Sequence, residues 1–181
     1  MRGASSELLP AREATAYRSV TMRLAYLAQD RGDLAEASKY LAQRMKAPRI
    51  HDWEQVKRIA RYLTTRPAAR LRFRRQRWPG KATVYTDSDW GSCPISRQST
   101  SGMVLMHGRH CLRTSATLQS LTTLSVAESE FYALIKGSSA VLGLQSLFAD
   151  WGLQVTVEVQ SDSTSAKSML GRKGVAKVKH M

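Results

Sequence analysis

A short alternating segment that ends in two acidic residues constrains this chain more than any other feature. Residues 81–92 read K-A-T-V-Y-T-D-S-D-W-G-S, and small or apolar positions alternate with others up to Thr86, which predicts a β-strand. Side chains two positions apart on a strand point to the same face, so Asp87 and Asp89 would repel each other there. A hard divalent cation such as Mg²⁺ removes that repulsion because it binds carboxylate oxygens. For this segment alone, a solvated turn and a cation site both remain open.

The charge of the chain is strongly positive and unevenly distributed. The 181 residues contain 28 Lys and Arg against 14 Asp and Glu, which gives a net charge of +14. Residues 1–80 carry 18 basic and 7 acidic residues, whereas residues 81–181 carry 10 and 7. A surplus of this size in one half favours a surface that binds a polyanion, and nucleic acid is the polyanion we expect.

The composition does not favour a secreted or membrane-bound protein. Cys93 and Cys111 are too few for a disulfide framework, and their spacing is not that of a zinc site. The first residues lack the apolar core of a signal peptide, and no apolar run approaches the roughly 20 residues of a membrane helix. We therefore expect a cytoplasmic or nuclear protein with no membrane partner.

Residues 1–80 are expected to form a helical domain, followed by a second domain of residues 81–181. Apolar residues recur at helical spacing over 13–28, over 33–46 and again after residue 52. Gly32 and Asp33 predict the end of one helix and the N-cap of the next, and Asp52 predicts the N-cap of the third. The length of the chain allows two such domains.

A basic run lies at the end of the first predicted domain. Residues 71–80 read L-R-F-R-R-Q-R-W-P-G, and alternation of Leu71 and Phe73 with Arg72 and Arg74 predicts an edge strand with a basic face. A solvated surface and a contact with a phosphate backbone explain this run equally well.

The second half of the chain predicts an α/β (α+β) fold. Its elements occur in the order β-β-β-α-β-α, which is typical of a mixed sheet with flanking helices. Strands are expected at 82–88, 102–107, 109–115 and 154–160. A long helix is expected from Leu121 to about Phe148 with Ser125 as N-cap, and a short one, capped by Ser163 or Thr164, reaches Leu170.

Three acidic residues hold comparable places in this pattern. Asp87 ends the first predicted strand, Glu130 lies in the first turns of the long helix, and Asp162 follows the last strand. Acids in such places can converge at one edge of a sheet and hold two metal ions about 4 Å apart for phosphodiester hydrolysis. Glu128 is not expected to face the same cleft, because about 100° per residue turns it about 200° from Glu130. Each acid taken alone is more simply a cap or a surface charge.

Five motifs of the second half match a known family in the family's order: Y-T-D-S-D-W (85–90), R-Q-S-T-S-G-M-V (97–104), L-S-V-A-E-S-E-F-Y-A-L (124–134), S-D-S-T-S-A (161–166) and K-V-K-H-M (177–181). With these motifs the chain resembles the ribonuclease H domain of copia-type LTR-retrotransposon Pol polyproteins. Residues 17–80 resemble the end of the preceding reverse transcriptase and its connection, through L-A-Y-L-A-Q-D-R-G-D-L (24–34) and W-E-Q-V-K-R-I-A-R-Y-L (53–63). The resemblance implies a ribonuclease H-like mixed sheet behind a basic helical segment.

The resemblance implies an endonuclease that hydrolyses the RNA strand of RNA–DNA hybrids with two Mg²⁺ ions, Mn²⁺ being an alternative. Asp87, Glu130 and Asp162 match three of the family's four catalytic, metal-binding acids. The fourth acid of the family follows a K-H-[apolar] motif, which here is the last tripeptide, 179–181. We therefore expect a C-terminally truncated domain that lacks the fourth ligand and the closing helix, with impaired activity.

The resemblance also implies contacts with a substrate and with partners. Gln98, Ser99, Thr100 and Ser125 match positions that contact the nucleic acid in the family, although turn and cap roles explain them equally well. The implied partners are an RNA–DNA hybrid or another nucleic acid, and the reverse-transcriptase portion of the same polyprotein. Two alternatives stay open: a non-catalytic nucleic-acid-binding remnant, and a fragment that does not fold alone because part of its sheet is uncovered.

Overall fold

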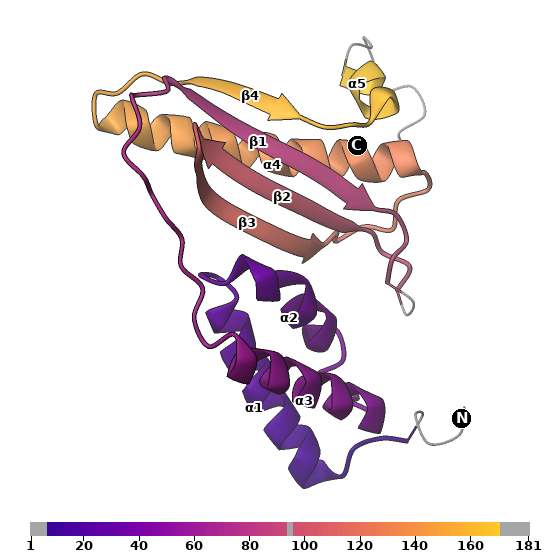
Figure 1. Ribbon diagram of the computed structural model, residues 1–181. Helices are drawn as coiled ribbons and strands as arrows, with labels where there is room; N and C mark the ends of the chain where they lie inside the picture. The colour runs from indigo at the N-terminus through magenta and orange to yellow at the C-terminus, as the bar shows by residue number, and fades with distance from the viewer. Residues whose placement is uncertain (1–6, 94–95, 171–181) are drawn as a thin grey trace. The chain divides into compact units, whose positions relative to one another are not determined.

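The computed structural model describes residues 7–93 and 96–170, and the chain divides into two compact units (Figure 1). The first unit comprises Met1–Arg72 and the second Phe73–Met181. Each unit has its own core of buried apolar side chains. The K-V-K-H-M motif at 177–181, next to which a fourth acid is expected, lies outside the described residues.

Three α-helices and one short 3₁₀-helix make up the described part of the first unit. They are α1 (Ala11–Leu27), the 3₁₀-helix η1 (Gly32–Leu34), α2 (Ala35–Ala42) and α3 (Ile50–Thr65). Their inward faces bury Leu24, Leu34, Leu41 and Val56 around Tyr17, whose hydroxyl donates to the Leu41 carbonyl at 2.8 Å. The helices expected from apolar spacing are confirmed, although α2 ends earlier than expected.

The two N-caps expected in this unit are wrong. Asp52 is the third residue of α3, where its Oδ2 accepts from the backbone N–H of Arg49, the actual N-cap, at 2.8 Å. Asp33 lies inside η1 and accepts two hydrogen bonds from the Arg31 guanidinium, at 3.0 and 2.7 Å. A carboxylate stabilises the N-terminal end of a helix from the first turn as well as from the cap, so residue type alone does not separate the two positions.

The second unit is a four-stranded sheet with two helices. Its elements are β1 (Lys81–Asp89), β2 (Thr100–His107), β3 (His110–Leu118), α4 (Val126–Asp150), β4 (Thr156–Gln160) and α5 (Thr164–Leu170). The strand order is β3-β2-β1-β4, with β1 antiparallel to β2 and parallel to β4 (Figure 1). This arrangement confirms the expected α/β class with a mixed sheet.

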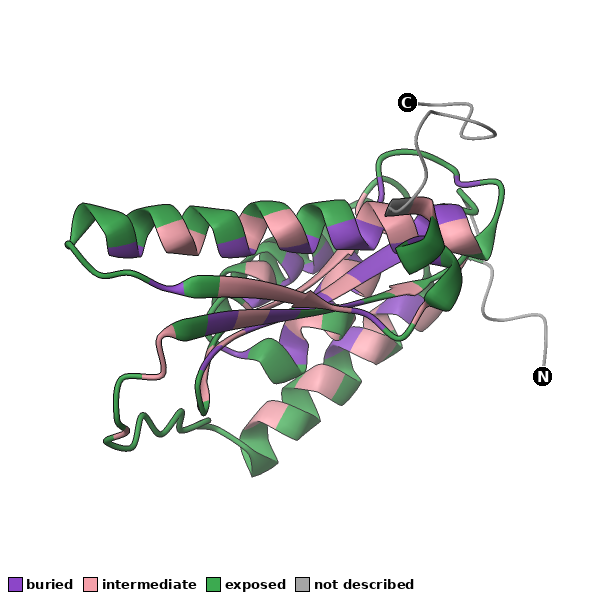
Figure 2. Ribbon diagram, turned by 90° about the horizontal axis from the view of Figure 1, so that it is seen from above, coloured by how far each residue is buried: buried purple, intermediate pink, exposed green. Residues whose placement is uncertain are grey.

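α4 packs along one face of the sheet and completes the core of the second unit. Val84, Leu105 and Val141 are buried between helix and strands, and the buried side of α4 faces the sheet while its outer side is exposed (Figure 2). Gly137 allows the close approach, because a Cβ there would overlap Thr86 Cγ2 on β1. Among the described helices, none combines the length and the apolarity needed to cross a membrane.

The basic run at 71–80 contains no strand, so the expected edge strand is wrong. The second part of this run is held by side-chain contacts and not by backbone pairing with a strand. Gln76 Nε2 donates to the His107 carbonyl at 3.0 Å, and Gln76 Oε1 accepts from the Arg109 backbone N–H at 3.0 Å. The ring of Trp78 lies edge-on to His107, with 4.7 Å between ring centroids. Leu71 and Phe73, whose alternation with arginines suggested the strand, are both exposed, so that alternation marks neither a strand nor a packed side.

Candidate functional site

Asp87 lies near the C-terminal end of β1. Ala82, Val84 and Thr86 alternate with more exposed residues and are buried on the side of the strand that α4 covers. Asp87 itself is exposed, and its Oδ1 accepts from the backbone N–H of Ser88 at 2.9 Å. The carboxylate of Asp87 is therefore accessible at one end of the sheet.

α4 carries Glu130 in its second turn, and the cap of the helix fixes its direction. Ser125 Oγ accepts from the N–H of Glu128 at 3.2 Å, and Glu128 Oε2 accepts from the N–H of Leu124 at 2.7 Å. The first bond confirms Ser125 as the N-cap, and the second engages the carboxylate of Glu128. Glu130 points elsewhere and is buried, with 5% of its surface exposed.

Asp162 lies between β4 and α5. β4 runs parallel to β1 with Gln160 opposite Tyr85, so both strands end at the same edge of the sheet. Ser163 Oγ accepts from the N–H of Ala166 at 3.1 Å, which starts α5 immediately after the acid. The side chain of Asp162 is therefore exposed at the edge where β1 delivers Asp87.

The structure brings Asp87, Glu130 and Asp162 together. Each offers one carboxylate oxygen, and these oxygens lie within 4.8 Å of one another. Within residues 7–93 and 96–170, no other group of three acidic, histidine or cysteine side chains has this proximity. Asp89, at the last position of β1, is exposed and is not part of the cluster.

The three carboxylates are poorly neutralised by the protein around them. Burial raises the pKa of Glu130, hydrogen bonding by Ser88 acts in the opposite direction, and the charges of Asp87 and Asp162 raise it further. Glu130 Oε2 is buried and has no hydrogen-bond partner among the described residues. Such an oxygen is costly unless a proton or a cation neutralises it. A set of carboxylate oxygens fits Mg²⁺ or Mn²⁺, and their role as metal ligands stays a prediction.

All four residues matched to substrate contacts form hydrogen bonds inside the second unit. Ser125 caps α4, and Thr100 Oγ1 lies 2.9 Å from Ser92 Oγ. Gln98 Nε2 donates to the Ser120 carbonyl at 3.0 Å. Ser99 is fully buried, and its Oγ lies 2.9 Å from Thr123 Oγ1. Thr100 is buried at the start of β2. These bonds tie together the loops beside the acids, and a contact with substrate stays a prediction for each residue.

Sequence reasoning missed a polar network that supports the acid cluster. Ser88 Oγ lies 2.8 Å from Ser129 Oγ, so β1 and α4 are joined beside Asp87 and Glu130. The Ser129 carbonyl accepts from Gln119 Nε2 at 2.9 Å, and the same nitrogen donates to Ser101 Oγ at 2.9 Å. The only sequence signal is a serine next to each acid, and serine is common in turns and near helix ends.

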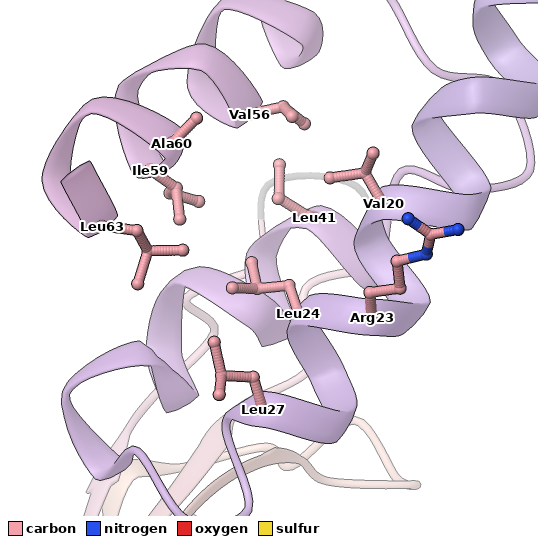
Figure 3. A pocket seen from close by; sticks show the side chains of 9 residues that line it. All are labelled: Val20, Arg23, Leu24, Leu27, Leu41, Val56, Ile59, Ala60 and Leu63. Carbon is pink, nitrogen blue, oxygen red and sulfur yellow. The ribbon is translucent and has the colours of Figure 1, made fainter. Parts of the chain in front are cut away.

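An apolar hollow of about 170 Å³ lies in the first unit, between α1, α2 and α3 (Figure 3). Leu24, Leu41 and Val56 contribute to its wall, and Arg23 is the one charged residue among the described residues that line it. The described residues of the lining include no carboxylate and no nucleophilic side chain. The hollow therefore offers no catalytic chemistry, and the acid cluster remains the candidate site.

The chain is similar to part of two transposon proteins and to most of an effector. It is 30% identical over 144 residues to the retrovirus-related Pol polyprotein from transposon RE2 of Arabidopsis thaliana, and 29% identical over 144 residues to that from transposon RE1. These matches cover 80% of the chain and 10% of each polyprotein, so the chain spans about a tenth of their length. It is also 32% identical over 114 residues to secreted RxLR effector protein 161 of Plasmopara viticola, which covers 63% of the chain and 80% of that protein. No protein-family model matches the chain, and no solved structure matches it significantly.

Proposed function

The chain belongs to a family of proteins that includes the retrovirus-related Pol polyproteins of plant transposons, and from this premise we propose that its second unit is a ribonuclease H-type endonuclease. The proposed reaction is hydrolysis of the RNA strand of an RNA–DNA hybrid. The observation that carries the proposal is that Asp87 on β1, Glu130 on α4 and Asp162 between β4 and α5 bring carboxylate oxygens within 4.8 Å of one another. The β-β-β-α-β-α order, which the sequence pattern predicts, supports it as well.

Mg²⁺ is the metal we propose, with two ions expected and Mn²⁺ as the alternative. When bound, the ions supply a water molecule activated as a nucleophile at neutral pH and offset the negative charge that develops on the phosphoryl oxygens. Asp87 and Asp162 are exposed and accessible to a phosphodiester, whereas Glu130 offers its oxygen from the buried side. Without a cation, three carboxylates at this separation repel both one another and the substrate phosphate.

The proposed partners are an RNA–DNA hybrid and the reverse-transcriptase portion of a longer polyprotein. The match covers 10% of each relative named as a Pol polyprotein, so such a relative has room for further domains beside the matched region. The net charge of +14 supports an anionic partner such as nucleic acid.

A strand-specific cleavage assay tests the proposal. We expect the chain to cut the labelled RNA strand of an RNA–DNA hybrid in Mg²⁺ or Mn²⁺, to leave the DNA strand intact and to lose activity in EDTA. The cleavage rate should fall by about 100-fold or more in each of three variants, Asp87→Asn, Glu130→Gln and Asp162→Asn. Loss of a residue that only orients a metal ligand already lowers metal affinity or activity by about 10–100-fold, so loss of a ligand itself should cost at least as much.

Asp89→Asn is the matched control, because it removes the same charge from the same strand outside the cluster. It should retain most of the activity. Cleavage that persists at the wild-type rate in the three cluster variants would refute the role of the acids, and the complete absence of cleavage by the wild-type chain would refute the proposed activity.

A further inference from the structure

Four exposed arginines gather at the start of the sheet in the second unit. Arg74, Arg75 and Arg77 lie on residues 73–78, called the basic strap here, and Arg109 lies in the turn between β2 and β3. None of them takes part in an ion pair among the described residues. Their charges are therefore uncompensated by the protein and open to an anionic partner.

The basic strap is attached firmly to the β2–β3 turn. Beside the two Gln76 bonds to this turn, His110 Nε2 lies 2.7 Å from the Arg74 carbonyl, and the Phe73 ring lies edge-on to His110 with 5.2 Å between centroids. Gly108 permits the contact, because a Cβ there would come within 2.6 Å of Gln76 Oε1. The strap thus presents its arginines from a backbone already held in place.

The strap arginines and the acid cluster lie at opposite ends of β1. Ala82, at the start of β1, pairs with His107 next to the β2–β3 turn, whereas Asp87 pairs with Gly102 far along β2. Six steps of about 3.3 Å separate Lys81 from Asp87, a distance of about 20 Å. A duplex that contacts both regions must extend about six base pairs between them, at about 3.4 Å per pair.

The acid cluster needs a cationic surface elsewhere on the protein to bind a nucleic-acid duplex. The clustered carboxylates repel a phosphate backbone until cations neutralise them, so affinity for a duplex has to come from positive charge elsewhere. We propose that Arg74, Arg75, Arg77 and Arg109 form a phosphate-binding surface for the backbone of a nucleic-acid duplex, at the end of β1 opposite the acid cluster. The inference rests on the proposed function for the identity of the duplex as an RNA–DNA hybrid, but not for duplex binding itself.

Binding without cleavage tests this inference. The full 181-residue chain is titrated into a fluorescently labelled RNA–DNA hybrid of about 18 base pairs in EDTA, and anisotropy is followed between about 50 and 200 mM salt. Replacing all four arginines by alanine should weaken binding and should make the slope of log K against log salt shallower by up to about 3.6, since each phosphate contact contributes about 0.9.

Two matched variants separate the surface from net charge. Four exposed basic residues of the first unit, Arg12, Lys46, Arg58 and Arg61, are replaced by alanine to remove the same charge. This control should keep the wild-type slope. Replacement of the four strap-surface arginines by lysine keeps the charge and should also keep the slope, which guards against a folding defect in the alanine variant.

A Gln76→Leu variant tests the attachment of the strap. It keeps every charge but removes the bonds to the β2–β3 turn, and we expect affinity to fall roughly two- to tenfold with the salt slope unchanged, as for lost preorganisation. Wild-type affinity in this variant would overturn the role of the attachment.

The inference is overturned if the alanine variant binds like the wild type, or if the control variant loses the same affinity and slope. Because the assay contains no divalent metal, a chain that never cleaves RNA still gives a clear answer. Failure of the proposed activity and failure of this inference are therefore distinguishable.

Discussion

Ser88 Oγ lies 2.8 Å from Ser129 Oγ, and this contact joins β1 to the first turns of α4 beside two of the three clustered acids. Ser129 is fully buried, and its hydroxyl donates to the Val126 carbonyl at 2.8 Å. The Ser88 and Ser129 hydroxyls are close enough to share a hydrogen bond in which either oxygen can be the donor. The pair therefore fixes the distance between Asp87 and Glu130 from the side away from solvent.

Removal of this bond should loosen the metal site. We expect Ser88→Ala to weaken Mn²⁺ binding by roughly tenfold, measured by calorimetry, because partners that orient metal ligands are typically worth 10–100-fold. Ser139→Ala, an exposed serine on the same helix, is the control and should bind Mn²⁺ like the wild type. Equal affinities in all three proteins would show that the serine pair does not position the acids.

Glu130→Gln should stabilise the metal-free protein and abolish its response to metal. The variant removes a buried negative charge that faces Asp87 and Asp162, so the melting temperature in EDTA at pH 7 should rise. Mg²⁺ should raise the melting temperature of the wild type by mass action and should leave that of the variant nearly unchanged. Thermal melts with and without Mg²⁺ check both parts, and a lower melting temperature of the variant in EDTA would contradict the first.

Two glycines of α4 should respond to alanine in opposite ways. Gly137→Ala places a Cβ against Thr86 Cγ2 and 3.4 Å from Val84 Cγ2, so we expect a loss of about 1–3 kcal/mol in unfolding free energy from overpacking. At Gly143 no atom of the described residues lies within 4 Å of such a Cβ, and its replacement should stabilise the helix by about 0.5–1 kcal/mol. Urea denaturation measures both, and stabilisation by Gly137→Ala would contradict the packing of α4 on β1.

The Arg31–Asp33 ion pair should make the stability of the first unit decrease at low pH. Hydrogen bonding by Arg31 lowers the pKa of Asp33 from 3.8 to about 2. A carboxyl whose pKa falls on folding contributes stability that is complete above pH 3.8 and disappears as the pH falls through about 2. Asp33→Asn should therefore lower the melting temperature at pH 7, and the difference from wild type should shrink toward pH 2.

The control for this ion pair is Asp30→Asn, which changes an exposed acid three residues earlier. It should melt close to the wild type at both pH values. A difference between Asp33→Asn and wild type that stays constant down to pH 2 would show that the loss comes from packing and not from ionisation.

The acid cluster was predictable because strand ends and helix starts are visible in the sequence. Asp87 and Asp162 each come after apolar and polar residues that alternate as in a strand. Ser125 is a typical N-cap and predicts the start of the helix that carries Glu130. Convergence then follows from the mixed sheet, in which β1 and β4 run parallel and end at the same edge. The sequence cannot place a serine pair such as Ser88 and Ser129, whose positions are 41 residues apart, because each serine alone is an ordinary local hydrogen-bonding residue.

The prediction of an edge strand at 71–80 was wrong for a related reason. The alternation of Leu71 and Phe73 with arginines extends over only four residues, and both apolar side chains are exposed, so it indicates neither burial nor backbone pairing. Here Gln76 and Trp78 face the β2–β3 turn, and the backbone of the segment remains outside the sheet. The partners of these two side chains lie about 30 residues later, at a distance along the chain that no local pattern records.

β4 is parallel to β1, so both strands end beside the acids. Between Glu130 and Asp162 the chain therefore runs away from the acids along the sheet and then returns to them. The 25 residues of α4 cover the outward run, and the exposed turn at Gly152 reverses it at the end remote from the acids. Extra residues inserted at that turn would lengthen the path without changing where it finishes. This turn is therefore a suitable point for grafting a fluorophore tag or a short peptide epitope while the carboxylates keep their spacing.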